Sequence, residues 1–504
     1  MSPAACLMLQ GTASGVGKSL LTAALCRVLA RRGVRVAPFK AQNMALNAAV
    51  TRDGAEIGRA QAAQAEAAGV EPTVDMNPIL LKPEGEDRSQ VVVRGAPIGR
   101  MSFGEYRARA GALLQVVGES LARLRASHDV VVIEGAGSPA EINLAATDIV
   151  NMAVARLARA PVLLVGDIDR GGVFAAFVGT LALLAPDDRA RVAGLIVNRF
   201  RGDATVLAPG LDRLRALTGV PVLGVVPYLE RDLVAAEDSL DLDEPWQGED
   251  TRLVLDIAVP RLPRIANFDD LTPLTREPGV GVRFVRTVGG LAGADLVVLP
   301  GSKSTAADLA WLRATGLAGA IAAAASRGTP VLGICGGYQM LGRAIHDPEG
   351  VDGSPGSVPG LGLLPVETAF DRDKRTTRVR ARVTGAWPLL ACAAGREIEA
   401  YEIHMGRTSV APGRAPFVLA GEGCACRAEG AVDGTGLVAG TYLHGLFEDD
   451  HVRGAMLAAL ARRRGLAPDL RWGAPQPASA RYDRLADAVS GALDVAAIAR
   501  LVGL

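Results

Sequence analysis

The first half of the chain alternates short apolar runs with amphipathic stretches of helical period. Runs that are apolar at nearly every position are typical of strands covered on both faces, so this rhythm predicts βαβ units around a parallel sheet. A helix is predicted over residues 18–33, where Leu21, Leu25, Val28 and Leu29 fall on one face. The predicted strands of this half are residues 5–10, 34–39, 129–135, 161–167, 193–198 and 221–227.

The rhythm breaks over residues 228–252, an acidic stretch with little apolar periodicity that suits an exposed linker. A second βα series then begins, with predicted strands at residues 253–259, 282–286, 295–301, 330–335 and 436–445. The pattern therefore predicts an α/β fold with two doubly wound domains. The expected division is a first domain at 1–228, a linker at 229–251, a second domain at 252–450 and a helical C-terminal tail at 451–504.

Composition narrows the possible partners. The 504 residues contain 54 Lys plus Arg and 54 Asp plus Glu, so we expect neither nucleic acid nor an anionic membrane as a partner. The most apolar stretch, residues 316–326, is well short of the roughly 20 residues that span a bilayer and is predicted to be a buried helix. The six cysteines are scattered and the N-terminus lacks the pattern of a secretory signal, which favours a reduced, cytoplasmic location.

Residues 11–19, GTASGVGKS, have the character of a phosphate-binding loop that is one residue longer than the usual pattern. The loop follows an apolar strand and opens a helix, so backbone N–H groups and the helix N-terminus would face an anion. Lys18 would reach the terminal phosphates, and Ser19 would offer its hydroxyl to Mg²⁺. The alternative is a Gly-rich turn without a ligand. The predicted nucleotide-binding residues of the loop are Gly11, Thr12, Gly15, Gly17, Lys18 and Ser19.

Polar side chains follow three other predicted strands of the same half. Glu134 ends an apolar strand before Gly-Ala-Gly, at the edge where doubly wound sheets bind ligands. Asp167 and Asp169 also end a strand there, and could bind metal, hold substrate or cap the next helix. Lys40 follows the second strand, where a lysine is usually no more than solvated.

The stretch PVLGICGGYQMLG places Cys335 between an apolar strand and the glycines that open a helix. This is the arrangement of a nucleophile elbow, in which a tight turn exposes the reactive side chain, although many buried cysteines are only structural. The other five cysteines lack this setting. Cys424 and Cys426 form a lone C-x-C without a second pair of ligands, so zinc is not expected.

Both motifs resemble known families. The spacing GT…VGKS resembles the dethiobiotin synthetase-like branch of P-loop proteins, which implies that Lys40 is a second phosphate-facing lysine and Glu134 a carboxylate for Mg²⁺. The stretch around Cys335 resembles class I glutamine amidotransferases. That resemblance implies His444, in GTYLHGLFE, as the partner base and residues 299–305, LPGSKST, as the loop that stabilises the oxyanion.

The second motif departs from the commonest amidotransferase pattern at one point. Many members carry Pro-Glu directly after the histidine, whereas this chain has Gly445 and Leu446, and the nearest acid is Glu448. The third member of the catalytic group therefore stays unassigned. Glu402 and His404, in YEIHMG, belong to the resembled family's pattern and also receive no role.

Taken together, the two halves resemble the glutamine-dependent cobyrinate amidases of cobalamin biosynthesis, through KAQNMALNA, EGAGSPAEINL, DIDRGGVFA, YEIHMGRT and GTYLHGLFE. The resemblance covers nearly the whole chain. It implies a glutamine-hydrolysing carbon–nitrogen ligase with ATP and Mg²⁺ as cofactors, and L-glutamine and a corrinoid as substrates. The implied reaction amidates the b, d, e and g carboxylates of adenosylcobyrinic acid a,c-diamide through an acyl phosphate that ammonia captures.

Three alternatives remain open from the sequence. Within the family, the rival is the a,c-diamide synthase, which adds two amides to unamidated cobyrinic acid. A partition-type nucleotide-switch ATPase usually carries a second lysine early in the loop, where this chain has Thr12 and Ala13. An uncoupled cysteine hydrolase would leave the nucleotide site without a role.

Overall fold

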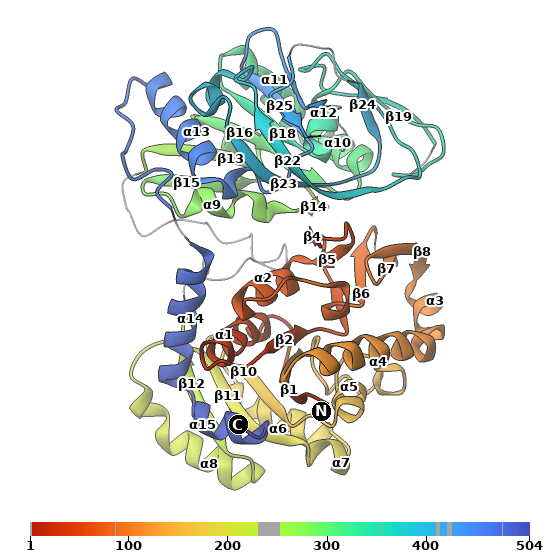
Figure 1. Cartoon of the computed structure of the whole chain (residues 1–504), viewed down its shortest axis with the longest axis vertical. Coiled ribbons are helices and arrows are strands. Elements are labelled where there is room, and N and C mark those ends of the chain that lie inside the picture. The colour runs from red at the N-terminus through yellow and green to blue at the C-terminus, as the bar shows by residue number, and fades with distance from the viewer. Residues whose placement is uncertain are drawn as a thin grey trace. The chain divides into compact units, whose positions relative to one another are not determined.

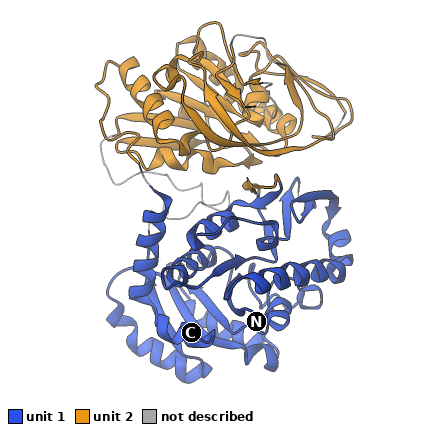
Figure 2. Cartoon of the chain, in the orientation of Figure 1, with its two compact units in different colours: residues 1–45, 55–237, 477–504 blue, residues 46–54, 238–476 orange. Residues whose placement is uncertain are grey.

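A computed structural model of the chain describes residues 3–85, 87–229, 253–353, 355–409, 414–420, 426–475 and 477–504. The chain divides into two compact units, one formed by residues 1–45, 55–237 and 477–504 and the other by residues 46–54 and 238–476 (Figure 2). Apart from residue 229, the predicted linker at 229–251 lies outside the described residues. The predicted tail at 451–504 is divided between the units.

The first unit is built on a six-stranded sheet in which each pair of neighbouring strands is parallel (Figure 1). The register pairs Leu9 of the first strand with Glu134 of the next strand in the sheet. Every strand predicted for this half is present. In sheet order the strands are β12 (Val222–Pro227), β11 (Val192–Phe200), β10 (Val162–Asp167), β1 (Ala5–Gly11), β9 (Val130–Glu134) and β2 (Val36–Phe39).

Helices follow the strands of this sheet, as the alternating pattern predicts. The predicted helix after the first strand is α1 (Lys18–Arg31), which starts one residue after Gly17. The other helices of the unit are α2 (Arg59–Ala68), α3 (Phe103–Ala108), α4 (Ala110–Ser127), α5 (Met152–Ala158), α6 (Val173–Leu183), α7 (Pro186–Arg189), α8 (Ala208–Thr218), α14 (Ala478–Ala492) and α15 (Val495–Leu501).

A smaller sheet stands apart from the main sheet of the first unit and was not predicted. Its strands are β3 (Gln42–Met44), β6 (Ile79–Pro83), β7 (Arg88–Val93) and β8 (Ala96–Ser102), and the last three pair antiparallel. The chain enters this sheet directly after Lys40. β3 has only three residues and β8 is largely exposed, while the apolar runs of β6 and β7 are only three residues long, so the pattern of the main sheet is missing here.

The last helices of the chain complete the core of the first unit. Side chains of α14 and α15, including Leu485 and Ile498, belong to the same buried cluster as Leu21 and Leu25 of α1. Arg27 of α1 also pairs with Asp483 of α14 at 2.8 Å, although both side chains are partly exposed. The end of the chain is therefore an integral layer of this unit, beside the helix that follows the phosphate loop.

The second unit contains a second parallel sheet whose last strand alone runs antiparallel. It includes all five strands predicted for this half, and the α/β prediction with two doubly wound sheets is confirmed. In sheet order the strands are β15 (Val280–Val285), β13 (Leu255–Pro260), β16 (Leu296–Leu299), β18 (Val331–Ile334), β28 (Val438–Thr441) and β27 (Ala431–Val432).

Further short elements of the second unit surround this sheet. The helices are α9 (Thr272–Thr275), α10 (Thr305–Ala314), α11 (Leu317–Ser326), α12 (Gly336–Leu341) and α13 (Asp450–Arg463). The helix predicted at 316–326 is present as α11, but it is buried on one face only, through Leu317, Ala318, Ile321 and Ala324. An antiparallel sheet consists of β23 (Glu397–His404), β22 (Arg375–Val383), β25 (Phe417–Leu419) and β26 (Arg427–Glu429). The remaining strands are β4 (Ala48–Val50), β14 (Ile265–Ala266), β17 (Gly301–Ser302), β19 (Ala344–Asp347), β20 (Gly356–Pro359), β21 (Glu367–Ala369) and β24 (Arg407–Ser409).

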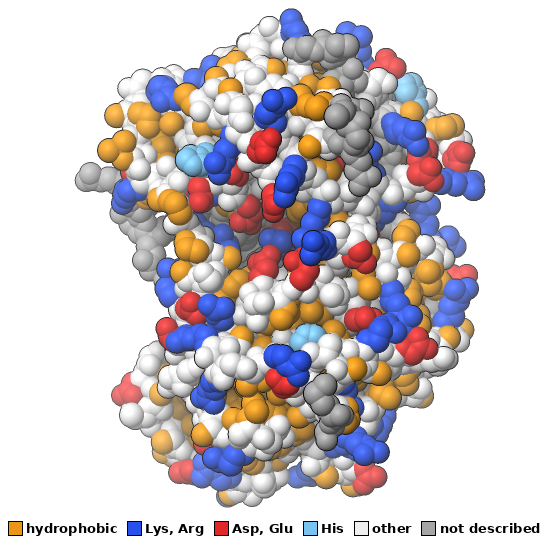
Figure 3. Space-filling model, in the orientation of Figure 1, with side chains coloured by type: hydrophobic (Ala, Val, Ile, Leu, Met, Phe, Trp, Pro, Cys, Tyr) orange, Lys and Arg blue, Asp and Glu red, His pale blue; other side chains and the backbone are white. Residues whose placement is uncertain are grey.

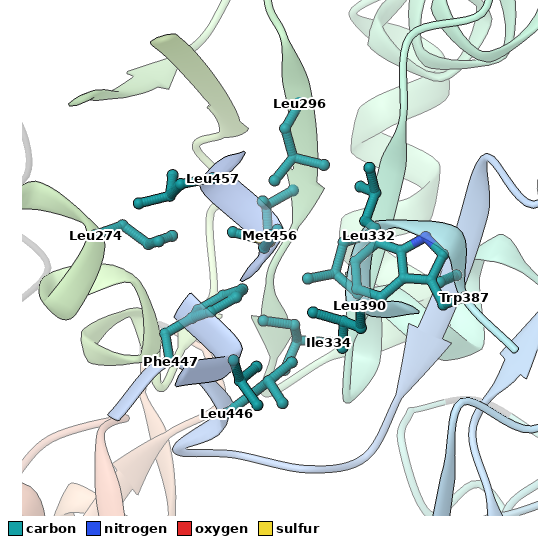
Figure 4. Close-up of a cluster of buried hydrophobic side chains, with 14 of the residues drawn as sticks. Leu274, Leu296, Leu332, Ile334, Trp387, Leu390, Leu446, Phe447, Met456 and Leu457 are labelled. Atoms are coloured by element: carbon teal, nitrogen blue, oxygen red, sulfur yellow. The ribbon is translucent and has the colours of Figure 1, made fainter. Parts of the chain in front are cut away.

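The main core of the second unit combines side chains of the parallel sheet, of the antiparallel sheet and of α13. Figure 4 shows Ile334 next to Leu446, with Phe447 beside them. Ile334 directly precedes Cys335, and Leu446 is two residues after His444. The same apolar cluster therefore holds the backbone on one side of each predicted catalytic residue, and packing at crystal-like density leaves such segments little freedom.

Basic and acidic side chains lie interspersed on the face of the molecule shown in Figure 3. Within the described ranges, no single helix combines the length and the apolar character needed to cross a membrane. The helices α10 and α11 reach that length and hydropathy only as a pair, which is bent by 82° at its break.

Candidate functional sites

The phosphate loop joins β1 to α1 in the first unit. Gly15 and Gly17 have positive φ angles of 69° and 93°, a region that glycine adopts without steric cost. A Cβ atom added to Gly11 would lie only 2.8 Å from the carbonyl oxygen of Ala13, so the loop turns back closely on itself. Lys18 is buried, and its Nζ donates to the carbonyl oxygens of Ala13 and Gly137 at 3.1 and 3.2 Å.

The carboxylate of Glu134 is the centre of the polar contacts next to this loop. Its Oε1 accepts hydrogen bonds from Ser19 Oγ and from Lys40 Nζ, each at 2.8 Å. Its Oε2 accepts from Gln64 Nε2 at 2.5 Å, and Glu134 itself is only 1% exposed. The structure thus brings together Lys18, Ser19, Lys40 and Glu134, four residues that the sequence placed in one site.

This arrangement fits the predicted magnesium ion. Mg²⁺ takes oxygen ligands and commonly uses one or two protein carboxylates together with phosphate oxygens and water. The Ser19 hydroxyl and the Glu134 carboxylate lie next to each other at the start of α1. No group of three or more His, Cys, Asp and Glu side chains suited to a metal occurs in the described part of the chain, so nucleotide and water would complete the shell.

The two alternative metal ligands, Asp167 and Asp169, are paired with arginines instead. Asp167 Oδ2 accepts from Arg199 Nη1 at 3.0 Å, and its Oδ1 accepts from the backbone N–H of Asp169. Asp169 Oδ1 accepts from Arg201 Nε at 3.2 Å. These contacts offset the charge of both carboxylates at the end of β10.

Gln64 is a residue of this site that the sequence analysis missed. Besides its bond to Glu134, its Nε2 lies 3.3 Å from the carbonyl oxygen of Ser19. Gln64 is fully buried on α2, a helix of mostly alanine that carries a second buried glutamine, Gln61, and neither was singled out from the sequence.

The second candidate site is in the other unit, at the end of β18. Cys335 has φ 51° and ψ −109°, outside the usual regions for a non-glycine residue, as expected of a nucleophile elbow. Its backbone N–H donates to the carbonyl oxygen of Thr441 at 2.8 Å, and its Sγ lies 3.5 Å from the carbonyl oxygen of Ile403. Gly337, two residues after Cys335, has no room for a side chain, because an added Cβ would lie 1.9 Å from the carbonyl oxygen of Leu299.

The predicted oxyanion loop, residues 299–305, lies against this elbow. A Cβ on Gly336 would be 2.8 Å from the backbone nitrogen of Ser302. The loop is held from outside by Asp308, whose Oδ2 accepts from Ser302 Oγ at 2.7 Å. Burial raises the pKa of Asp308 to about 6, against the opposing effect of these hydrogen bonds.

His444 follows β28 and is 1% exposed. Its Nδ1 donates to Asp270 Oδ2 at 2.7 Å, and its ring stacks on Tyr401 with centroids 5.2 Å apart. Its Nε2 has no hydrogen-bond partner among the described residues. Burial lowers the pKa of His444, but the Asp270 carboxylate and then Cys335 outweigh it and raise this pKa to about 10. These interactions therefore favour the protonated, imidazolium form of His444.

Asp270 fills the position that the sequence analysis left unassigned. It lies in the short 3₁₀ segment Phe268–Leu271, and its other oxygen accepts from the backbone N–H of Gly445 at 2.8 Å. Glu448, the nearest acid in the sequence, is not the carboxylate bonded to Nδ1. The sequence gives little indication of this role, because Asp270 lies 174 positions before the histidine and no motif surrounds it.

Glu402 and His404 lie on β23, on either side of the Ile403 carbonyl that contacts Cys335. Glu402 is fully buried and accepts from Arg375 Nε and Arg427 Nη2, each at 2.6 Å. Burial raises the pKa of Glu402, but the nearby His404 ring, the hydrogen bond from Arg427 and the charge of Arg375 prevail and lower it to about 2. His404 donates through Nδ1 to Gly406 O, and its ring stacks on the ring of Tyr442 at 3.7 Å.

Of the predicted C-x-C pair, Cys424 lies outside the described residues and Cys426 is an exposed free cysteine.

Comparison with known proteins finds one family model in each half of the chain. Residues 7–241 match the family described as the CobQ/CobB/MinD/ParA nucleotide binding domain, and residues 256–452 match the CobB/CobQ-like glutamine amidotransferase domain. A nucleotide-binding half joined to a glutamine amidotransferase half defines an ATP-dependent, glutamine-hydrolysing ligase. The chain belongs to the cobyric acid synthase family.

Two relatives carry that assignment. The cobyric acid synthase of Sorangium cellulosum is 57% identical, over 99% of this chain and 98% of the relative. That of Moorella thermoacetica is 49% identical, over 99% and 97%. Among solved structures, a chain of PurLQS from Thermotoga maritima is 19% identical over 41% of this chain and 99% of its own length, with a TM-score of 0.31, which is too low to support an argument.

Proposed function

We propose that the protein amidates the b, d, e and g carboxylates of adenosylcobyrinic acid a,c-diamide, using ATP and L-glutamine, to give adenosylcobyric acid. The observation that carries this proposal is the identity of 57% to a cobyric acid synthase along nearly the whole chain. A match of that extent includes both candidate sites and favours this reaction over a partition-type ATPase, an uncoupled hydrolase or the a,c-diamide synthase.

The second unit would release ammonia from glutamine. The Cys335 thiolate attacks the side-chain amide carbon, and backbone N–H groups of the loop at 299–305 would stabilise the oxyanion that forms. The His444 imidazolium gives its proton to the departing nitrogen, which leaves as ammonia. Water then hydrolyses the thioester, which gives glutamate and restores the thiolate, with Asp270 holding the imidazole throughout.

The first unit would activate the acceptor. A side-chain carboxylate of the corrinoid attacks the γ-phosphorus of ATP and ADP leaves, which gives an acyl phosphate. Ammonia then attacks the acyl carbon, and phosphate departs as the amide forms. Lys18 and Lys40 would balance the charge that spreads over the phosphate oxygens during transfer.

Ser19 and Glu134 would hold Mg²⁺ in this unit, and the ion would supply positive charge that offsets part of the charge of the phosphates. The contact of Lys40 with Glu134 has a consequence for this step. Because Lys40 Nζ and Ser19 Oγ share one carboxylate oxygen, Lys40 has to change its partner when a cation takes that oxygen.

We infer a cytoplasmic location, which the free cysteines Cys6, Cys26, Cys335, Cys392 and Cys426 support, since reduced thiols persist in reducing compartments.

Product mass tests the proposed reaction. The purified protein is incubated with ATP, Mg²⁺ and glutamine, and with either adenosylcobyrinic acid a,c-diamide or unamidated cobyrinic acid. We expect four successive exchanges of a hydroxyl for an amino group on the diamide and none on cobyrinic acid. Two such exchanges on cobyrinic acid would instead identify the a,c-diamide synthase, and no ATP-dependent amidation of either would refute an amide ligase.

A further inference from the structure

A short segment of the N-terminal half of the sequence belongs to the second compact unit. Residues 46–54 are grouped with residues 238–476, whereas the residues directly before and after them are grouped with the first unit (Figure 2). The segment contains β4 and follows β3, which the chain enters directly after Lys40. One continuous stretch of backbone thus leads from a residue of the nucleotide site into the unit that carries Cys335.

The contacts of this segment within the second unit are specific. The backbone N–H of Ala48 donates to Asn267 Oδ1 at 3.1 Å, and the carbonyl oxygen of Val50 accepts from Arg378 Nε at 2.8 Å. Ala48, Val50 and Asn267 are each at most 5% exposed. A backbone donor and a side-chain acceptor buried together form a bond whose loss leaves a polar group unsatisfied, which is costly.

Asn267 starts the 3₁₀ segment that holds the triad carboxylate. It has φ 51° and ψ 39°, a left-handed conformation that asparagine adopts more readily than most residues. Its carbonyl oxygen accepts from the backbone N–H of Asp270 at 3.2 Å. Asp270 in turn bonds His444 Nδ1 and Gly445 N. The turn at Asn267 therefore sets where the carboxylate lies relative to the imidazole.

At its other end, the stretch begins at Lys40, which pairs with the carboxylate of the predicted metal site. Lys40 is 5% exposed and pairs with Glu134, but it must leave that oxygen if a cation binds there. Lys40 and Ala48 are eight positions apart in the sequence. Lys40 and the bond to Asn267 are therefore joined by one short, continuous stretch of backbone.

We propose that Asn267 is a positioning residue, through which the segment at 46–54 makes the geometry of the Asp270–His444 pair depend on the state of the nucleotide site. This inference rests on the proposed function, since it assumes that the first unit binds ATP and the corrinoid. Its purpose would be to restrict glutamine hydrolysis to times when an activated carboxylate is present to consume the ammonia.

The test measures glutamine hydrolysis in the full-length protein with and without ATP, Mg²⁺ and the corrinoid, and takes the ratio of the two rates as the coupling. Asn267→Gly allows the same positive φ but removes the side-chain acceptor of the Ala48 N–H. Asn267→Asp is a separate variant that keeps an acceptor of the same shape. We expect Asn267→Gly to lower the coupling by at least about fivefold, a typical size for linked sites, and Asn267→Asp to retain it. Ala48→Pro removes the donor without touching Asn267 and should act like Asn267→Gly.

Three results would overturn the inference. One is a coupling of one in the wild type, which means equal rates with and without ATP, Mg²⁺ and the corrinoid. A second is a wild-type coupling in both Asn267→Gly and Ala48→Pro. A third is an equal loss of coupling in Asn267→Gly and Asn267→Asp. If Asn267 acts through its side-chain acceptor, only the variant that lacks the acceptor should lose coupling. Amidation with ammonia and ATP, measured in parallel, tests the proposed function alone, so that its failure is separate from a failure of coupling.

Discussion

Asp270 and His444 are 174 residues apart in the sequence, yet Asp270 Oδ2 lies 2.7 Å from His444 Nδ1. Both side chains are buried, and the second oxygen of Asp270 holds the backbone N–H of Gly445. The carboxylate therefore fixes both the ring and the backbone next to it. Cys335 also raises the pKa of His444, and we propose that these three residues form the catalytic centre of the second unit.

Asp270→Asn should lower the rate of glutamine hydrolysis by about 10²-fold or more, because an amide supports neither the imidazolium nor its tautomer as a carboxylate does. Amidation with ammonia should continue. Steady-state kinetics with both nitrogen sources would measure this. Asp269→Asn is the matched control, since it changes the neighbouring acid and should leave hydrolysis near the wild-type rate. Similar losses in both variants would point to disturbance of the 3₁₀ segment instead.

Cys335→Ser should abolish amidation driven by glutamine but preserve amidation driven by ammonia at alkaline pH, because the thiolate is needed only to release ammonia. Mass spectrometry of the corrinoid with each nitrogen source gives the readout. His444→Ala should give the same division. A folded Cys335→Ser protein that lost both activities would contradict separate sites for hydrolysis and ligation.

Lys18→Ala should reduce amidation by about 10²-fold or more with either nitrogen source, because it removes a charge directed at the transferring phosphate. Glutamine hydrolysis at Cys335 should persist. The variant is thus the converse of Cys335→Ser, and the pair makes a two-way comparison. Near wild-type synthesis from ammonia in Lys18→Ala would rule out the phosphate-loop assignment.

Glu134→Gln nearly preserves the size of the side chain but removes the charge that a metal needs. We expect the variant to fold, to require a much higher Mg²⁺ concentration for amidation and to keep its glutaminase activity. A titration of the amidation rate with Mg²⁺ measures the shift. Asp167→Asn is the comparison: an unchanged Mg²⁺ requirement in Glu134→Gln, with a raised one in Asp167→Asn, would transfer the metal role to the end of β10.

Glu429 and Glu402 should give the second unit opposite dependences on pH. Burial raises the pKa of Glu429 from 4.5 to about 7, so between these values the folded protein binds more protons than the unfolded chain. Its contribution to the unfolding free energy therefore falls as pH rises through this window, by at most about 1.4 kcal/mol per pH unit. Glu402, with its pKa lowered to about 2, contributes stability above pH 4.5 that is lost as pH falls.

Urea unfolding of the wild type, Glu429→Gln and Glu402→Gln would check both pH dependences, between pH 4.5 and about 7 for Glu429 and below pH 4.5 for Glu402. Trp311, Trp387 and Trp472 lie in the described part of the second unit, so their fluorescence reports on that unit. The unfolding free energy of the wild type minus that of Glu429→Gln should fall as pH rises. The unfolding free energy of the wild type minus that of Glu402→Gln should fall as pH falls. The same sign in both comparisons would contradict the assigned environments.

The sequence predicted the features that depend on local pattern. Runs of apolar residues located the parallel strands, and the motifs around Lys18 and Cys335 lie at strand ends as expected. Glu134 could be linked to the phosphate loop because parallel strands share one edge of a sheet. Each of these inferences needed only a short stretch of sequence and a general rule of sheet architecture.

The features that depend on distant parts of the chain were not predictable in this way. Asp270 and Gln64 reach their partners through tertiary packing, and nothing in their neighbours marks them. The segment at 46–54 reads as part of the first domain, yet it is grouped with the second unit. The helices α14 and α15 looked like a tail, because an amphipathic helix does not reveal which surface covers its apolar face.

The place of α14 and α15 in the first unit has a consequence for synthesis of the chain on the ribosome. The residues of α1, β1 and β9 emerge early, but the helices that share their apolar cluster are the last to be made. At typical elongation rates of about 5–20 residues per second, roughly ten to fifty seconds separate the end of β12 from the start of α14. During that interval the nascent first unit lacks the two helices that share this cluster, so its core is completed only after the second unit has been synthesised.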